Sequence, residues 1–202
     1  MALTSDGMNR KTTHDRKEEI KQAVLKIIKE SGIKAVSTKR LAAEIGLSEG
    51  AIFRHFEKKS DIIRSIVDDV AQDLIGNLKE IAESDLPPRE KLEKYLCTTI
   101  NYLLENNGIT ILLLSEATYN NDSGMLDKLR YIFNAQRRYF EQIIRQGIDL
   151  GIWRPDVKLN DVSLLYMGIP ITLNTSIVLG IYPFDRRHFC KDMIGQIERL
   201  IS

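Results

Sequence analysis

The side chains best suited to bind a charged polymer lie in one short stretch, Ser37 to Lys59. Its residues read STKRLAAEIGLSEGAIFRHF, followed by EKK. Arginine can form two hydrogen bonds with the edge of a guanine, and lysine, serine and histidine can bond to phosphate oxygens. This set of residues favours contact with nucleic acid over catalysis.

Local signals in this stretch predict two helices joined by a tight turn. The first spans about 38–45 and has one apolar face. Gly46 suits the left-handed conformation that ends a helix, and Ser48 is a good N-cap for the next helix. That short second helix buries Ile52 and Phe56, and its outward residues are Glu49, Ala51, Arg54 and His55. The layout predicts a helix-turn-helix whose second helix enters a DNA major groove.

The charge is distributed unevenly along the 202 residues. Residues 1–60 hold 13 Lys and Arg against 8 Asp and Glu, whereas residues 61–202 hold 16 against 20. The excess of basic residues in 1–60 and of acidic residues in 61–202 is typical of a polyanion-binding domain followed by a soluble body. With 43% hydrophobic and 28% charged residues, the chain is typical of a globular protein with a core.

Helical periodicity continues to the end of the chain, so the predicted fold is all-α with about nine helices. A flexible arm (1–14) would precede a helix-turn-helix DNA-binding domain (15–60) and a body for ligand binding and dimerisation (61–202). One helix, from Lys59 to about Glu83, would belong to both domains. The other predicted helices cover about 15–31, 88–105, 109–117, 125–150, 159–179 and 185–201.

The remaining sequence gives little support to other functions. Cys97 and Cys190 do not form a metal-type pair and need not form a disulfide, so a reducing cytoplasm is expected. The apolar stretch 162–178 is too short and too polar for a membrane span, so we expect a buried helix and no membrane partner. No catalytic, metal or cofactor motif is present, so the protein is not expected to be an enzyme.

The stretch from Ile20 to Ile63 resembles the tetracycline-repressor (TetR/AcrR) family of transcriptional regulators. The resemblance rests on many spaced positions that match together: Gly32, Ser37, Thr38, Leu41, Ala42, Gly46, Leu47, Ser48, Gly50, Ile52, Phe53, His55, Phe56 and Lys59. The remainder matches in outline, through its helix lengths and a GIWRPD turn. Phe53 stands where the family often has a tyrosine that bonds to phosphate, and Glu49 stands where it often has lysine.

The resemblance implies roles for the residues around the second helix. Arg54 would contact a base and Ala51 a base edge or a thymine methyl, while Gly50 allows close approach to the groove. Phosphate contacts are expected from most of the others, although a solvated surface is the alternative for the lysines. The full predicted DNA-binding set is Thr38, Lys39, Ser48, Glu49, Gly50, Ala51, Phe53, Arg54, His55, Lys58 and Lys59.

The body is expected to form a homodimer and to bind an effector. A helix that is apolar all round needs cover on every side, and the family pairs its last two helices across a two-fold axis. The predicted dimer seam is Tyr166, Ile169, Leu173, Ile177, Phe189, Met193 and Ile197, with an intramolecular core as the alternative. The predicted pocket for a small apolar or amphipathic effector is Tyr95, Tyr102, Tyr119, Phe133, Arg137, Phe140 and Met167; these residues suit a plain core equally well.

Together these features predict a cytoplasmic prokaryotic regulator, nucleoid-associated when bound to DNA. It would be a ligand-responsive repressor that binds a palindromic double-stranded operator as a dimer. The alternative is a DNA-tethered factor whose body binds another protein in place of a small molecule.

Overall fold

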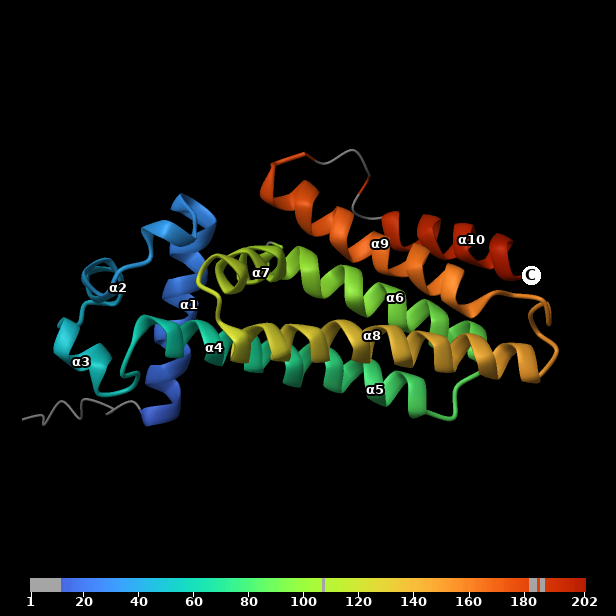
Figure 1. Cartoon of the computed structure of the whole chain (residues 1–202), viewed down its shortest axis with the longest axis horizontal. Coiled ribbons are helices and arrows are strands. Elements are labelled where there is room, and N and C mark those ends of the chain that lie inside the picture. Colours follow the sequence, from blue (N-terminus) through green and yellow to red (C-terminus); the bar gives the residue numbers. More distant parts are fainter. Residues whose placement is uncertain (1–11, 107, 182–184, 186–187) are drawn as a thin grey trace, which may run out of the picture. The chain divides into compact units, whose positions relative to one another are not determined.

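A computed structural model describes residues 12–106, 108–181, 185 and 188–202. These residues form helices and no strand, which confirms the all-α prediction (Figure 1). The helical elements are α1 (Thr13–Ser31), η1 (Ile33–Ala35), α2 (Thr38–Ile45), α3 (Glu49–Phe53), α4 (Lys59–Val70), η2 (Ala71–Ile75), α5 (Gly76–Glu83), α6 (Pro88–Glu105), α7 (Ile109–Tyr119), α8 (Ser123–Asp149), α9 (Leu159–Val178) and α10 (Phe189–Ile201). Because α4, η2 and α5 follow one another without a break, the described residues hold nine separate α-helices besides the short 3-10 turn η1.

The chain divides into two compact units between Ser65 and Ile66, inside α4. The predicted arm falls mostly outside the described residues. Helix α1 begins at Thr13, two residues earlier than predicted, because Thr12 and Asp15 form a reciprocal capping box. The core of the first unit is apolar and comes from all of its α-helices: Ile20, Val24, Ile27, Ile28, Leu41, Ile52, Phe56, Ile62 and Ile63.

The second unit is a bundle in which α6 contacts α5, α8, α9 and α10. Three aromatic rings lie at its centre, and each is fully buried. The rings of Phe140 and Tyr166 stack with centroids 4.3 Å apart, and Tyr95 lies 5.7 Å from Tyr166. Burial raises the pKa of both tyrosines well above the usual value of 10.0, because the phenolate would lose its hydration.

Two glycines are required by close approaches inside this unit. Gly108 has φ +67°, and an added Cβ would lie 2.9 Å from the backbone oxygen of Asn174 on α9. Gly147 on α8 lies against the ring of Trp153, where an added Cβ would be 2.0 Å from Cε3. Gly108 allows the α6–α7 turn to pack closely against α9. Gly147 allows the turn that follows α8 to pack against α8 itself.

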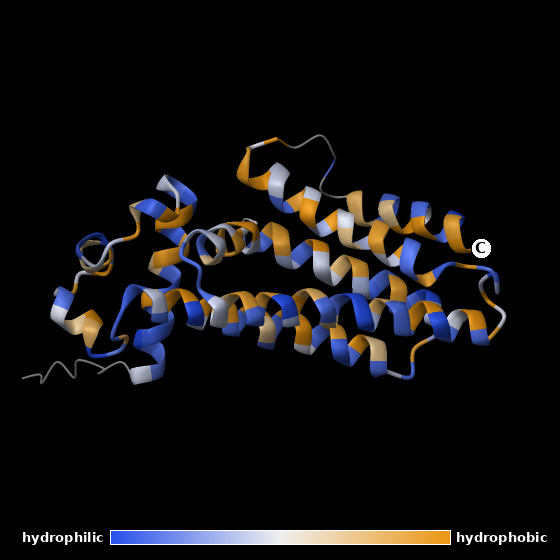
Figure 2. Cartoon of the chain, viewed as in Figure 1, coloured by the Kyte–Doolittle hydropathy of each residue, from blue (hydrophilic) through white to orange (hydrophobic). Residues whose placement is uncertain are grey.

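Helix α9 is longer than the apolar stretch seen in the sequence. It has 20 residues and, by length and composition alone, could cross a membrane (Figure 2). Of its apolar window, 44% is buried inside the protein.

Cys97 and Cys190 form a disulfide between α6 and α10, with 5.4 Å between their Cα atoms. The sequence had left this pairing open, and the structure forms it. Nothing in the spacing of residues 93 positions apart indicates that their helices pack together, and that packing is what brings the two sulfurs into bonding distance.

Candidate nucleic-acid interface

The helix-turn-helix is built from local caps. The side chain of Ser37 accepts a hydrogen bond from the backbone N–H of Arg40 and begins α2. Gly46 is left-handed, with φ 66° and ψ 34°, and ends α2. The hydroxyl of Ser48 accepts from the N–H of Ala51 and begins α3. Buried Ile52 and Phe56 then fix α3 against the first unit's core, which leaves its other side facing out.

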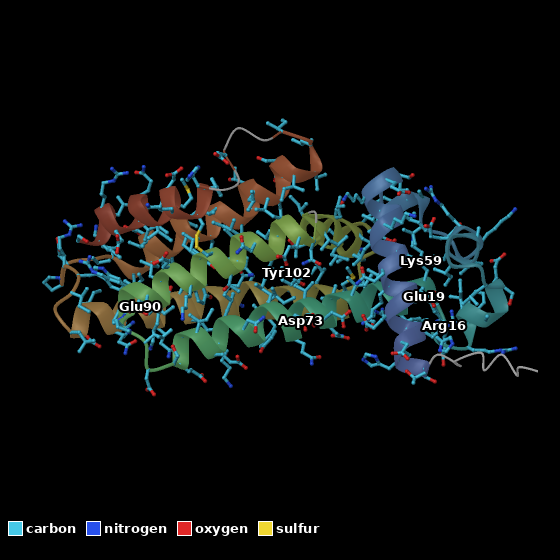
Figure 3. The ribbon with its side chains drawn as sticks, turned by 180° about the vertical axis from the view of Figure 1, so that it is seen from behind. Arg16, Glu19, Lys59, Asp73, Glu90 and Tyr102 are labelled. Atoms are coloured by element: carbon cyan, nitrogen blue, oxygen red, sulfur yellow. A yellow bond between two sulfur atoms is a disulfide. The ribbon has the colours of Figure 1, made fainter. Side chains whose placement is uncertain are left out.

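All eleven predicted DNA-binding residues reach the surface. The exposed ones are Lys39, Ser48, Glu49, Gly50, Phe53, Arg54 and Lys58, and the half-buried ones are Thr38, Ala51, His55 and Lys59. Lys59 opens α4, next to the end of α3 in the chain (Figure 3). Nothing lies within 4 Å of a Cβ added at Gly50, so this glycine leaves open space in front of α3.

Two groups of basic residues in the first unit differ in whether their side chains have a partner within the protein. Lys26 pairs with Glu44 at 2.5 Å, and this hydrogen bond raises the pKa of the Lys26 ammonium; Arg40 donates to the hydroxyl of Ser31 at 2.7 Å. These contacts tie α1 to α2. Among the residues that the structure describes, the side chains of Lys39, Arg54 and Lys58 have no acidic partner. Their charges remain available to a polyanion.

The position of Glu49 explains one departure from the family pattern. The hydroxyl of Thr38 on α2 donates to its Oε2 at 2.5 Å. Thr38, for which a phosphate contact is predicted, bridges the starts of the two helices through this bond. Glu49 also lies in the first turn of α3, where a negative charge favours the positive end of the helix dipole. No local sequence signal predicts this bond, because the two residues are 11 positions apart.

Two aromatic side chains at the end of α3, Phe53 and His55, differ in how far they are exposed. Phe53 is 47% exposed, which is unusual for phenylalanine and places an apolar ring beside Arg54 in sequence. His55 is half-buried, and its Nδ1 is enclosed without a hydrogen-bond partner in the structure. The arrangement presents cationic, apolar and hydrogen-bonding groups together, as a groove-binding helix requires.

The predicted effector-pocket residues do not converge on one cavity. Tyr95, Phe140 and Met167 are buried in the core, and Tyr102 is half-buried, with its pKa raised by burial and by the neighbouring carboxylate of Asp73 (Figure 3). Tyr119 is 80% exposed and Phe133 43% exposed, so both lie on the surface. Arg137 pairs with Glu141 at 2.8 Å and donates to Asn160 on α9. Helical periodicity identified the helices but not the direction of these side chains.

The predicted dimer seam needs correction at four positions. Tyr166, Leu173, Ile177 and Ile197 are buried within the protomer, where they cannot meet a partner. Ile169, Phe189 and Met193 are half-buried at the surface. Other apolar residues are exposed along α9 and at its C-cap: Leu164, Leu165, Ile171, Val178 and the cap residue Leu179. Because α9 is apolar on every side, its sequence could not indicate which face packs inside.

Two groups at the aromatic core were missed by sequence reasoning. The hydroxyl of Tyr95 donates to the backbone oxygen of Gln136 at 2.6 Å, and Thr99 shares a hydrogen bond with Tyr166 at 3.1 Å. The side-chain Oε1 of Gln136 is buried and has no partner in the structure. A buried acceptor without a donor is unusual and marks this place as a candidate for ligand recognition.

The comparisons with known proteins agree with this geometry. Residues 20–66 match the family model described as bacterial regulatory proteins, tetR family. The HTH-type transcriptional repressor KstR2 of Mycolicibacterium smegmatis is 24% identical over 162 residues, 80% of this chain and 78% of that protein. The nucleoid occlusion factor SlmA of Pectobacterium carotovorum is 25% identical over 136 residues, 67% and 69% of the two chains. The transcriptional regulator FadR from Bacillus subtilis, solved with stearoyl-CoA, has the same fold: TM-score 0.72 at 18% identity, over 92% of this chain and 99% of that one.

A helix-turn-helix that presents cationic side chains, followed by a helical body in the part of the chain that the structure describes, is the layout of a DNA-binding transcriptional regulator. Over residues 20–66 the chain matches the tetR family of bacterial regulatory proteins. Among the residues that the structure describes, no group of three His, Cys, Asp or Glu side chains could hold a metal ion.

Proposed function

We propose that this protein is a ligand-responsive repressor that binds a palindromic operator as a homodimer. The observation that carries the proposal is the surface around α3. Among the residues that the structure describes, Arg54, Lys39 and Lys58 have no acidic partner there, and Gly50 leaves space for a groove wall. Arg54 is the base-contacting residue, and the two lysines bind phosphates. The protein would act in the cytoplasm of a prokaryote, on the nucleoid when bound to DNA.

The outward face of α9 supports dimerisation. Leu164 is 71% exposed and Leu165 56% exposed, an arrangement that is unfavourable in water. Beside them a groove of about 650 Å³ separates α9 from α10, and its walls include Ile169, Phe189 and Met193. A second copy of the α9–α10 surface would cover both features and complete a four-helix interface. The two α3 helices would then meet half-sites about 34–36 Å apart.

The aromatic core supports a position for the effector. Its rings are apolar, and the unpaired Oε1 of Gln136 would accept one hydrogen bond from a ligand. This combination suits a mostly apolar or amphipathic molecule that carries a hydroxyl or amide donor. The stearoyl-CoA in the FadR structure is consistent with this class of effector.

Helix α4 and its continuation supply a route from effector to DNA. It runs unbroken from Lys59, beside α3, through the π-helical turn η2 into the body. Within the body, Lys128 on α8 forms an ion pair with Asp68 on α4. An effector that spreads the core would shift α4 and change the half-site spacing. Coupling of this kind is about 1–3 kcal/mol, or about 5–150-fold in operator affinity.

The test is selection of bound duplexes from a random DNA pool at moderate salt, with the full-length protein. Enrichment of an inverted repeat is the expected result. Weak, salt-sensitive binding to every sequence would contradict a sequence-specific dimer. With the operator in hand, a set of acyl, steroid and amphipathic compounds can be screened for release of DNA. Gln136→Leu should reduce the response to the active compound without reducing operator affinity in its absence.

A second candidate function is a DNA-tethered factor that binds another protein. The exposed apolar groove between α9 and α10 favours it, and the relative SlmA is named a nucleoid occlusion factor. The two candidates differ in what occupies the groove of the DNA-bound dimer and in the response to small molecules. A dimer that fills the groove and releases DNA on effector binding supports the repressor. A groove that stays open in the DNA-bound dimer, with no responsive small molecule, supports the tethered factor.

A further inference from the structure

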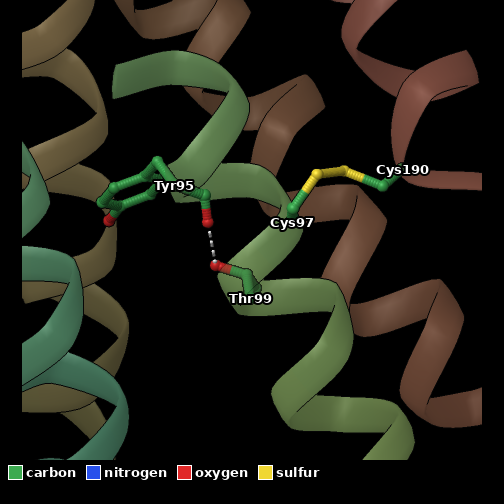
Figure 4. The surroundings of a disulfide bond; sticks show 4 residues. All are labelled: Tyr95, Cys97, Thr99 and Cys190. Atoms are coloured by element: carbon green, nitrogen blue, oxygen red, sulfur yellow. Dashed lines mark hydrogen bonds between the residues drawn. A yellow bond between two sulfur atoms is a disulfide. The ribbon is translucent and has the colours of Figure 1, made fainter. Parts of the chain in front are cut away.

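The disulfide between Cys97 and Cys190 joins α6 and α10, two helices that also pack against each other (Figure 4). Both cysteines are half-buried, so small molecules in solution can approach the sulfurs. Cys97 lies on α6 between Tyr95 and Thr99, which belong to the aromatic core (Figure 4). Cys190 is the second residue of α10.

Helix α10 is held unevenly along its length. Its fully buried residues, Ile197 and Ile201, both lie in its C-terminal half. The end of that half is fixed further by Arg154, whose backbone N–H donates to the oxygen of Ile201 at 2.9 Å and whose side chain donates to that of Leu200 at 2.7 Å. No residue of the first half is fully buried. The disulfide is therefore a covalent tie of that half to α6.

The same half of α10 forms one wall of the groove beside α9. Phe189, Asp192 and Met193 line the groove from α10, opposite Leu165 and Ile169 from α9. The position of this wall therefore depends on the Cys97–Cys190 bond. The groove is part of the surface that we assign to the dimer, and the inference below rests on that assignment.

We propose that Cys97 and Cys190 form a reversible thiol–disulfide site that sets the affinity of the dimer. In the oxidised protein the first half of α10 is fixed and the groove keeps the shape that fits a second copy. In the reduced protein residues 189–193 lose their covalent tie and open locally, which weakens dimerisation and, through it, operator binding. The chemical partners are a hydroperoxide for oxidation and a dithiol for reduction.

The oxidation balances as a two-electron step. One thiolate attacks an oxygen of hydrogen peroxide and breaks the O–O bond, which gives a sulfenic acid and, after protonation, one water. The second thiol then attacks the sulfenic sulfur and releases a second water as the S–S bond forms. In the reverse direction a dithiol is oxidised to its own disulfide and leaves two protein thiols.

The experiment uses the full-length protein, equilibrated either with hydrogen peroxide or with dithiothreitol under native conditions. Maleimide labelling and mass measurement count the thiols, with none expected after oxidation and two after reduction. Hydrogen exchange then compares residues 189–193 with residues 197–201. Faster exchange on reduction is expected in the first segment alone. Sedimentation at graded concentrations should show a dimer dissociation constant about tenfold higher in the reduced form.

The matched control is Cys97→Ser combined with Cys190→Ser, which should behave as the reduced protein under both conditions. A disulfide that dithiothreitol does not open without denaturant would overturn the reversible site. Equal exchange and equal dimer affinity in the two redox states would overturn its control of α10. Labelling and hydrogen exchange need no DNA, so they decide the inference even if operator selection fails and the proposed function is wrong.

Discussion

Replacing Gly147 by alanine provides a direct test of how the turn after α8 is built. An added Cβ would lie 2.0, 2.3 and 2.7 Å from three ring carbons of Trp153. Ordinary contacts begin near 3.4 Å, so the ring must move by more than 1 Å. Trp153 is only 2% exposed, and the backbone N–H groups of Ile152 and Trp153 both donate to the oxygen of Gly147. The ring therefore cannot move without breaking local packing.

The expected cost follows from these contacts. If the ring of Trp153 is displaced from its buried site, the loss of stability is comparable to that of truncating a buried tryptophan to alanine, about 3–5 kcal/mol. Alanine recovers about 1 kcal/mol over glycine through helix propensity. The free energy of unfolding should therefore fall by about 2–4 kcal/mol. For a chain of this size each kcal/mol lowers Tm by about 2–4 °C, so Tm should fall by about 4–16 °C.

The assay is urea unfolding followed by circular dichroism, with the emission of Trp153 as a local probe because it is the only tryptophan. Gly195→Ala on α10 is the matched control, since nothing lies within 4 Å of its added Cβ. That variant should be stabilised by up to about 1 kcal/mol. If Gly147→Ala is as stable as the control, the close packing of Trp153 on α8 is refuted.

Three further predictions concern the DNA-binding surface, the dimer and the core. Arg54→Ala should cost about 1–3 kcal/mol on the selected operator and relax preference at one base pair, whereas Lys58→Ala should weaken all sequences alike and reduce the salt slope by about 1; equal losses on every sequence for Arg54→Ala would remove its base contact. Leu164→Glu should leave a folded monomer, because this side chain is 71% exposed, and an intact dimer in sedimentation would exclude that face. The pKa values of Tyr95 and Tyr166 are raised in the folded protein, so above pH about 10 these tyrosines lose their protons in the unfolded state before they do so in the folded state. Their contribution to stability is therefore complete below pH about 10 and decreases at higher pH. Unfolding free energies measured from pH 8 to pH 11 should therefore fall above pH 10, and a flat profile would contradict the buried hydroxyls.

The helix-turn-helix could be predicted because its signals are local. Ser37, Gly46 and Ser48 each act on backbone groups within a few residues of themselves, and the structure places α2 at the predicted 38–45. The long helix from Lys59 to Glu83 also has the predicted bounds, since its apolar period is regular. The outward direction of Arg54 follows from the same periodicity, because Ile52 and Phe56 must face the core.

The tertiary structure decided what depends on neighbours distant in sequence. Tyr166 lies against Phe140 inside the protomer, although α9 offered an equally apolar face on its other side. Cys97 meets Cys190 only because α10 packs on α6, and Thr38 meets Glu49 only because the turn at Gly46 brings α3 back to the start of α2. The helical periodicity of the sequence indicates which face of a helix is apolar and which is polar. It does not indicate which element packs against that face, because this depends on the packing of the whole bundle.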